Sequence, residues 1–313
     1  MDEDLRDCAT DCRLHYQLRL ITNMTAELQT QLDLEADLAV SRALEEYLKS
    51  IFTDRAHDVD LSFYDVGANP VRLHHEQHIM DANQTSYTLY IPVHRYMHVA
   101  VANLEGNGAV QLADDGYSNT THLRQQAADT VDVQRSGLFS ARLPMEVQED
   151  LDQEFNVRLY MANCAAAVVL DTLGSHVRDI RVVGTGFASS FSLADSTFRF
   201  ERPSVIRAEK VPVEGGTESC YVTVNFPSRD VVAASKADGE ESPALWQMRV
   251  YATLPGGSVT ESVLQVKEPL QAGRVKIIKC RMNRQGEAVP ADASVGLAVR
   301  LDWQSGGEHI IDL

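Results

Sequence analysis

The sequence predicts an all-β protein with one notable helix, built from antiparallel β-sandwiches. The clearest segment is Val295–Trp303, where large apolar residues alternate with small or charged ones. The apolar set is Val295, Leu297, Val299, Leu301 and Trp303. A period of two puts these side chains on one face of a strand, which must lie over an equally apolar surface. Gln247–Leu254 and Cys220–Phe226 alternate in the same way. Half-buried strands at short spacing, with no parallel βαβ rhythm, are typical of an antiparallel sandwich.

The N-terminal part of the chain contains a regular strand followed by the strongest helix signal. Cys12–Leu20 alternates strictly, which predicts a strand with its even-numbered residues inward. After it, apolar residues recur every three or four positions in a stretch rich in Glu, Ala and Leu. We therefore expect a helix over about residues 34–52, with its apolar stripe across the first domain.

The remaining alternating segments predict further strands and two domains. The expected strands are Val59–Phe63, Tyr87–Ile91, Met97–Asn103, Leu138–Leu143, Val157–Met161, Ala165–Asp171, Val177–Val183, Phe198–Phe200, Trp246–Leu254, Val259–Val266, Val275–Met282, Val295–Trp303 and Glu308–Leu313. The polar stretch Ala113–Ser136 is expected to be a long surface excursion. Turn residues at Arg202-Pro203 and Glu214-Gly215-Gly216 place the domain boundary near residue 205, giving domains 1–205 and 206–313.

The composition limits the classes of partner and the cellular location. The net charge of -17 over 313 residues argues against nucleic acid and against anionic lipid head groups. The longest apolar run, Ala165–Leu170, falls far short of the roughly 20 residues that span a bilayer. The acidic start Met1-Asp2-Glu3-Asp4 does not resemble a signal peptide. We therefore expect either a cytosolic protein or a mature form with a substituted initiator Met.

The five cysteines leave at least one thiol without a cysteine partner. Cys8 and Cys12 could form a disulfide bond if the protein is exported. Cys164 and Cys220 lie in apolar segments and are expected to be core residues. The spacing of Cys8 and Cys12 does not fit a zinc knuckle, which uses paired Cys-x-x-Cys units.

The sequence carries no complete catalytic or metal-binding motif. His74-His75-Glu76-Gln77-His78 is the densest reactive cluster, but its spacing does not fit the His-Glu-x-x-His motif of metalloproteases. We expect a solvated polar loop there. His57, Asp58 and Asp60 could suggest a phosphohydrolase metal site, yet the two aspartates fit the outward face of an exposed strand. There is no nucleophile elbow, phosphate loop or dinucleotide fingerprint. The expected protein is non-enzymatic, with no catalytic, cofactor-binding or metal-ligating residues.

Several phrases of the sequence resemble one family. Glu3-Asp4-Leu5 before Cys8 and the strand from Cys12 resemble the opening of the mature FimB/Mfa2-like fimbrial anchor proteins of Bacteroidetes. His57–Asp65 is similar to a first-domain strand of that family, and Val295–Trp303 to its C-terminal signature. The likeness extends over nearly the whole chain.

The resemblance implies two tandem transthyretin-like antiparallel β-sandwich domains and a cell-surface role. Members are exported, are lipidated on a cysteine, and lie on the outer membrane as fimbrial base or accessory subunits. That cysteine would lie just before Asp2, where Met1 now stands, and Cys8 does not inherit its role. The expected partners are fimbrial shaft or accessory subunits and the outer membrane, without a cofactor.

Two functions from different classes follow. The first is a non-catalytic fimbrial anchor or accessory subunit that acts by subunit association, with one subunit's extended segment completing another's open sheet. Cys12–Leu20 and Glu308–Leu313 are the candidate segments. We expect the first to pair within its own domain and leave the second open. The alternative is an adhesin that binds a glycan or protein through loops at Ala113–Ser136 and Ala233–Pro243, where Tyr117 is the only aromatic residue.

Overall fold

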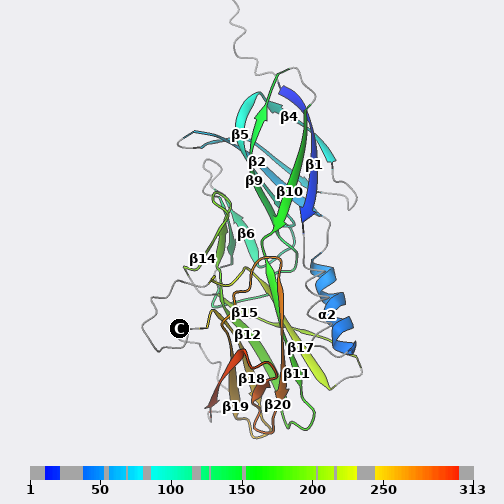
Figure 1. Ribbon diagram of the computed structural model, residues 1–313, viewed down its shortest axis with the longest axis vertical. Coiled ribbons are helices and arrows are strands. Elements are labelled where there is room, and N and C mark those ends of the chain that lie inside the picture. Colours follow the sequence, from blue (N-terminus) through cyan, green and yellow to red (C-terminus); the bar gives the residue numbers. More distant parts are fainter. Residues whose placement is uncertain are drawn as a thin grey trace, which may run out of the picture.

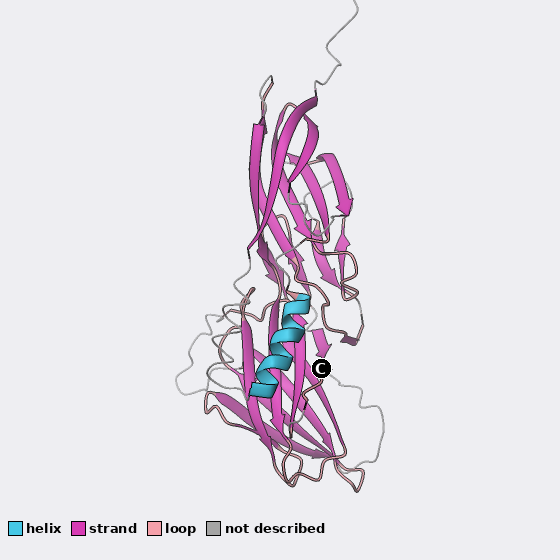
Figure 2. Cartoon of the chain, turned by 90° about the vertical axis from the view of Figure 1, so that its right-hand side faces the viewer, coloured by secondary structure: helices cyan, strands magenta, loops and turns pink. Residues whose placement is uncertain are grey.

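A computed structural model gives the fold as two β-sandwiches stacked end to end, with one helix along the lower one (Figures 1 and 2). The structure describes residues 11–21, 38–52, 56–67, 70–79, 86–114, 121–126, 128–149, 153–201, 204–214, 217–230 and 244–302. The predicted all-β architecture with a helix is confirmed for these residues. Their helix is not long and apolar enough to cross a membrane.

The helix and the strands are given in their order along the chain. They are β1 Asp11–Ile21, α2 Leu38–Ile51, β2 Asp58–Asp65, β3 Arg72–Ile79, β4 Ser86–Pro92, β5 His94–Ala102, β6 Val110–Ala113, β7 His122–Gln125, β8 Thr130–Val131, β9 Phe139–Val147, β10 Gln153–Met161, β11 Cys164–Asp171, β12 Asp179–Phe187, β13 Ser190–Ser192, β14 Thr197–Arg199, β15 Ser204–Arg207, β16 Glu209–Val211, β17 Glu218–Asn225, β18 Trp246–Thr253, β19 Val259–Val266, β20 Val275–Met282, β21 Ala288–Pro290 and β22 Val295–Asp302.

The upper sandwich is one seven-stranded sheet that folds over on itself. Its strand order is β3-β2-β5-β9-β10-β1-β4. β9 and β10 pair only where β9 begins and β10 ends, Ser140 with Tyr160 and Phe139 with Met161. The sheet bends there, so that Tyr16 of β1 reaches His98 of β5, although two strands lie between them in the sheet. The layer β10-β1-β4 therefore faces the layer β3-β2-β5-β9.

A small third layer explains why β2 is buried on both faces. The alternating residues Val59, Leu61 and Phe63 point into the sandwich, and Tyr64 points the other way. On that second side, the sheet β14-β13-β7-β6 supplies Leu123 and other residues of a separate apolar cluster. The outward face of β2, which the sequence predicts to be exposed, is therefore covered.

The lower sandwich packs the sheet β16-β17-β11-β20-β21 on the sheet β22-β19-β18-β12-β15-β8. β11 is buried along almost its whole length, and α2 packs on the same sheet at β16 and β17. Three strand pairs are parallel: β1 with β10, β11 with β20, and β8 with β15. The sandwiches are thus mixed, which the expectation of purely antiparallel sheets missed.

The helix packs on a different part of the molecule than expected. α2 spans Leu38–Ile51, within the predicted range, and buries Val40, Leu44 and Leu48 at helical spacing. It contacts β16 and β17, and the Tyr47 hydroxyl donates to Glu209 at 3.0 Å. The apolar stripe therefore lies on the lower sandwich and not across the first one (Figure 2). The stripe specifies an apolar partner but does not say which sheet supplies it.

The sheets suggest a revised division of the chain. β11 and β12 lie before residue 205, and β15 begins at Ser204, yet all three pair in the sheets of β17 to β22. The change from the upper to the lower sandwich falls at the short link between Met161 and Cys164. We propose that this link, and not residue 205, separates the two domains.

Two further segments differ from the sequence expectations. β22 confirms the predicted strand over Val295–Asp302, but it is an edge strand and Leu297 is 37% exposed. Ala113–Ser136 is only partly a surface excursion. β7 and β8 form within it, and Leu123, Val131 and Val133 are buried. Short strands of four and two residues leave too brief a pattern to read from sequence.

Candidate functional site

The histidine cluster of the sequence lies on β3, an edge strand of the upper sandwich, and not on a loop. Its side chains alternate between the two faces of the strand. On one face, His74 Nε2 and His78 Nε2 each lie 2.7 Å from an oxygen of Glu76. On the other, His75 Nε2 lies 2.8 Å from Asp60 Oδ2, and Gln77 donates to the same oxygen at 2.8 Å. A carboxylate holds each imidazole, which ties the strand to itself and to β2.

The same geometry argues against a metal centre. His74 and His75 point to opposite faces, so the cluster cannot converge on one ion. Among the described residues, no group of three or more His, Cys, Asp or Glu side chains could hold a metal.

The other candidate metal ligands have structural partners. Asp58 accepts the backbone N–H groups of Leu104 at 2.9 Å and Glu105 at 3.0 Å, so it holds the turn after β5. The backbone N–H of His57 donates to Asn103 Oδ1 at 2.7 Å. Asp60 is 7% exposed, not on an exposed face as expected. The two aspartates therefore hold neighbouring backbone and side-chain groups in place.

A buried polar pair joins the two layers of the upper sandwich. The Tyr16 hydroxyl donates to His98 Nε2 at 2.5 Å, and His98 Nδ1–H donates to the Ser62 carbonyl at 3.0 Å. Phe63 stacks on the His98 ring with centroids 4.3 Å apart. Burial lowers the pKa of His98 to about 4 and raises that of Tyr16, so both groups are neutral. The pair fixes β1 in its register and does not contact solvent.

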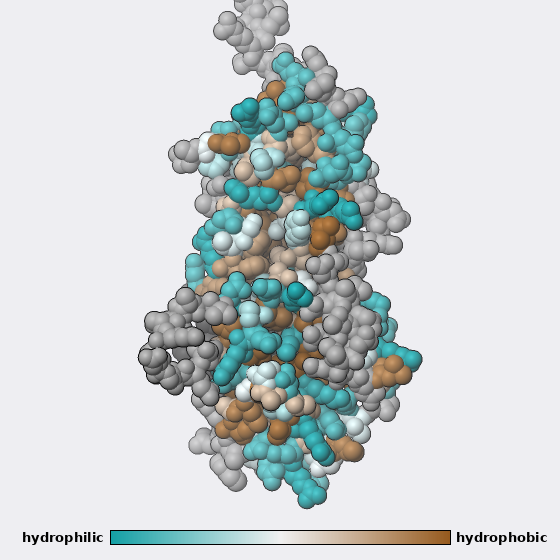
Figure 3. Space-filling model, in the orientation of Figure 1, coloured by the Kyte–Doolittle hydropathy of each residue, from teal (hydrophilic) through white to brown (hydrophobic). Residues whose placement is uncertain are grey.

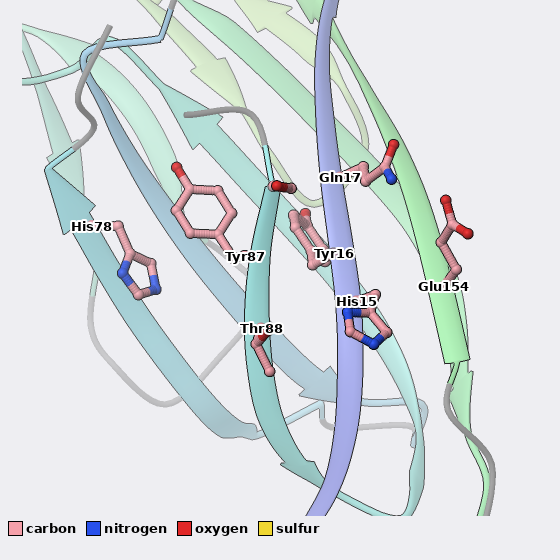
Figure 4. Close-up of a pocket in the computed structure, with 8 residues that line it drawn as sticks. His15, Tyr16, Gln17, His78, Tyr87, Thr88 and Glu154 are labelled. Atoms are coloured by element: carbon pink, nitrogen blue, oxygen red, sulfur yellow. The ribbon is translucent and has the colours of Figure 1, made fainter. Parts of the chain in front are cut away.

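A hollow of about 640 Å³ opens beside the edge strands β3 and β4. Its lining is polar and aromatic (Figure 4): His15, Tyr16, Gln17, His78, Ser86, Tyr87, Thr88 and Glu154. The Tyr87 and His78 rings lie 5.1 Å apart, across the gap between the two strands. Burial raises the pKa of Tyr87 to about 12, and its hydroxyl has no hydrogen-bond partner in the described part of the chain. Such a lining can hold a polar ligand, but it contains no nucleophile–base pair.

Of the two segments predicted as candidates for strand exchange, the structure describes only the first. β1 pairs with β10 on one side and β4 on the other, so it completes its own sandwich, as expected. Glu308–Leu313 lies outside the described residues, as do Trp303, Tyr117 and Ala233–Pro243. Cys8 also lies outside them, so a bond to Cys12 is not tested. Cys164 and Cys220 are buried core residues, as predicted.

Sequence reasoning did not single out the strands that lie at the sheet edges. Of the described strands, β22 is the longest edge of the lower sandwich and pairs with β19 alone over eight residues. Its side chains Leu297 and Ala298 are exposed. An edge strand offers unpaired backbone groups to a second chain. Position at an edge depends on which strands flank β22, and no local pattern encodes that.

The chain is similar in fold to several solved structures from Bacteroidetes. A candidate adhesin from Bacteroides ovatus has a TM-score of 0.55 at 8% identity, covering 95% of this chain and 98% of the other. A candidate adhesin from Bacteroides thetaiotaomicron has a TM-score of 0.54 at 11% identity, covering 93% and 97%. The fimbrial anchor protein Mfa2 from Porphyromonas gingivalis has a TM-score of 0.50 at 10% identity, covering 93% and 98%. No family profile and no curated protein matches the sequence.

Proposed function

We propose that the protein is a non-catalytic subunit of a bacterial surface fimbria, acting as an anchor or accessory subunit. The observation that carries this proposal is a fold shared with an anchor protein and candidate adhesins over nearly the full length of each chain. We further propose that both sandwiches are transthyretin-like domains. We also propose that a lipid anchor holds the protein at the outer membrane.

Association through strand edges fits this role. Among the described strands, β22 pairs on one side alone and has a partly apolar face, with Leu297 exposed. A strand from a shaft or accessory subunit could add to it, with ladder hydrogen bonds supplying affinity and alternate side chains setting register.

Deleting the gene in the parent organism tests the anchor role. The mutant should shed fimbriae into the medium or carry longer ones, and the wild-type gene should restore the normal state. Complementation with Leu297→Lys should restore protein level but not fimbrial retention, because a charge on the edge opposes strand addition. Unchanged fimbriae in the deletion mutant would contradict the proposal.

An adhesin is the second candidate, favoured by the polar and aromatic hollow beside β3 and β4. In that case the deletion mutant would keep normal fimbriae and lose attachment to a glycan or protein surface. The hollow, and not the loops expected from sequence, is the described feature that supports this alternative.

A further inference from the structure

The outward face of the upper sandwich carries two arginines side by side. β1 and β10 run parallel, and their register pairs Gln17 with Asn156, Arg19 with Arg158, and Ile21 with Tyr160. Gln17, Arg19, Asn156, Arg158 and Tyr160 are exposed, with Tyr160 at 56%. We call these five residues the arginine face. It lies where the two strands run side by side toward the waist of the molecule (Figure 1).

The arginines of this face have no carboxylate partner among the described residues, unlike several others in the chain. Exposed Arg95 and Arg207 each contact a carboxylate across strands. The chain has 45 acidic and 28 basic residues, so acidic partners are abundant.

The nearest described carboxylate along the two strands is too distant to neutralise the face. It belongs to Glu154, four residues before Arg158 on β10, which is about 13 Å along a strand. Like charges in adjacent strands destabilise a sheet by up to about 1 kcal/mol. Their position therefore has a cost in stability that the fold itself does not require.

We propose that the arginine face binds an acidic polysaccharide through its carboxylate or sulfate groups. Guanidinium groups bind such anions with two parallel hydrogen bonds. The Gln17 amide can bond a sugar hydroxyl in the neighbouring row, where Asn156 donates to Glu154 at 3.4 Å, and the Tyr160 ring offers an apolar surface to a sugar ring. Successive pairs on this face lie about 6.6 Å apart along the strands, so one extended ligand can make all three kinds of contact.

The charge of the whole protein favours a thin ligand over a broad anionic surface. At -17, the chain is repelled by a lipid bilayer or by nucleic acid, which extend over much of its surface. At physiological ionic strength, charges beyond about 8 Å are largely screened. A single polysaccharide strand can contact the two arginines while the rest of the protein stays distant. The proposal depends on the proposed function only for the cell-surface location.

Native affinity electrophoresis of the whole chain tests the proposal with matched polymers. The probes are dextran sulfate against dextran, and polygalacturonate against its methyl ester, so that each pair differs in charge alone. The charged polymers should retard the wild-type protein and the neutral ones should not. The double variant Arg19→Ala/Arg158→Ala should bind at least tenfold more weakly, and Tyr160→Ala should also weaken binding.

The control is Arg281→Ala, which removes one exposed arginine from β20 in the lower sandwich and should leave binding unchanged. Arg19→Lys/Arg158→Lys keeps the charge and should bind between wild type and the alanine variant. Thermal unfolding should show the alanine variant at least as stable as wild type, because a like-charge contact is removed. Equal binding by wild type and the alanine variant would overturn the proposal, and so would stronger binding to poly-glutamate than to both acidic polysaccharides. Fimbrial retention in cells is a separate readout, so failure here leaves the anchor role untouched.

Discussion

At the scale of single residues, the pair of Tyr16 and His98 has the sharpest consequence for stability. His98 is fully buried, accepts from Tyr16 and donates to the Ser62 carbonyl, so the imidazole has no room for a second proton without losing a bond. Burial lowers its pKa from 6.5 to about 4 in the folded state. The unfolded chain therefore binds more protons than the folded one between these two pH values.

We predict that the protein loses stability as the pH falls from about 6.5 to about 4. A lowered folded-state pKa means that the contribution is fully retained above 6.5 and lost progressively below it. The lowered pKa corresponds to a loss of about 3 kcal/mol. Urea unfolding at pH 7 and pH 4.5 should show a steeper loss for wild type than for His98→Gln, in which this group cannot titrate. Equal losses in the two proteins would contradict the lowered pKa of His98, since the carboxylates and the other histidines titrate in both.

At Gly186, any side chain would collide with the backbone of the neighbouring strand. Gly186 in β12 has φ +92°, and a Cβ there would lie 2.7 Å from the Leu245 carbonyl oxygen and from Trp246 Cα. The neighbouring register of β12 with β15 shifts between Gly184 and Phe187. A bulge that needs positive φ and close backbone approach thus accounts for glycine at this site.

At the scale of elements, α2 shows how a local pattern can be right about structure and wrong about place. Its burial at Val40, Leu44 and Leu48 follows the periodicity of the sequence. Its partner is the face of β16 and β17, which lie more than 150 residues later in the chain. Because the helix joins β1 to β2 of the upper sandwich, it connects the two sandwiches.

We predict that Leu44→Ala destabilises the protein by about 2–5 kcal/mol, because it leaves a cavity at a fully buried position. Leu38→Ala is the matched control, since Leu38 is 64% exposed on the same helix and its truncation should cost within about 0.5 kcal/mol. Guanidinium unfolding followed by fluorescence of Trp246, buried in the lower sandwich, measures both. A Leu44→Ala protein as stable as Leu38→Ala would show that the helix does not cover that sheet.

At the scale of the whole molecule, a buried polar network joins the sandwiches at the waist. Asn163 lies in the link between β10 and β11 and is fully buried. Its amide nitrogen donates to Gln134 Oε1 at 3.0 Å and to the Ser136 carbonyl at 2.9 Å, and its oxygen accepts the Leu138 N–H at 3.3 Å. The network therefore holds the segment before β9 against the start of the lower sandwich.

We predict that Asn163→Ala costs about 2–4 kcal/mol and separates the unfolding of the two sandwiches. The substitution leaves two buried polar groups, Gln134 Oε1 and the Leu138 N–H, without their partner. Circular dichroism, which reports on both sandwiches, and Trp246 fluorescence should give one midpoint for wild type and different midpoints for the variant. Coincident transitions in Asn163→Ala, at any stability, would contradict a coupling role for this network.

The sequence by itself determined the strands and the helix, because alternation and helical spacing record which side chains face an apolar layer. Cys12–Leu20 and Val295–Asp302 are strands where the pattern predicts them. The sequence predicts a loop at the histidine cluster because both faces of β3 are polar, which removes the alternation of hydrophobicity. Tertiary structure alone decided which elements lie together. It places α2 on the lower sandwich, β11 in the lower sandwich and Arg19 beside Arg158. Those relations depend on strand order and register, which join residues far apart in the chain and leave no trace in local spacing.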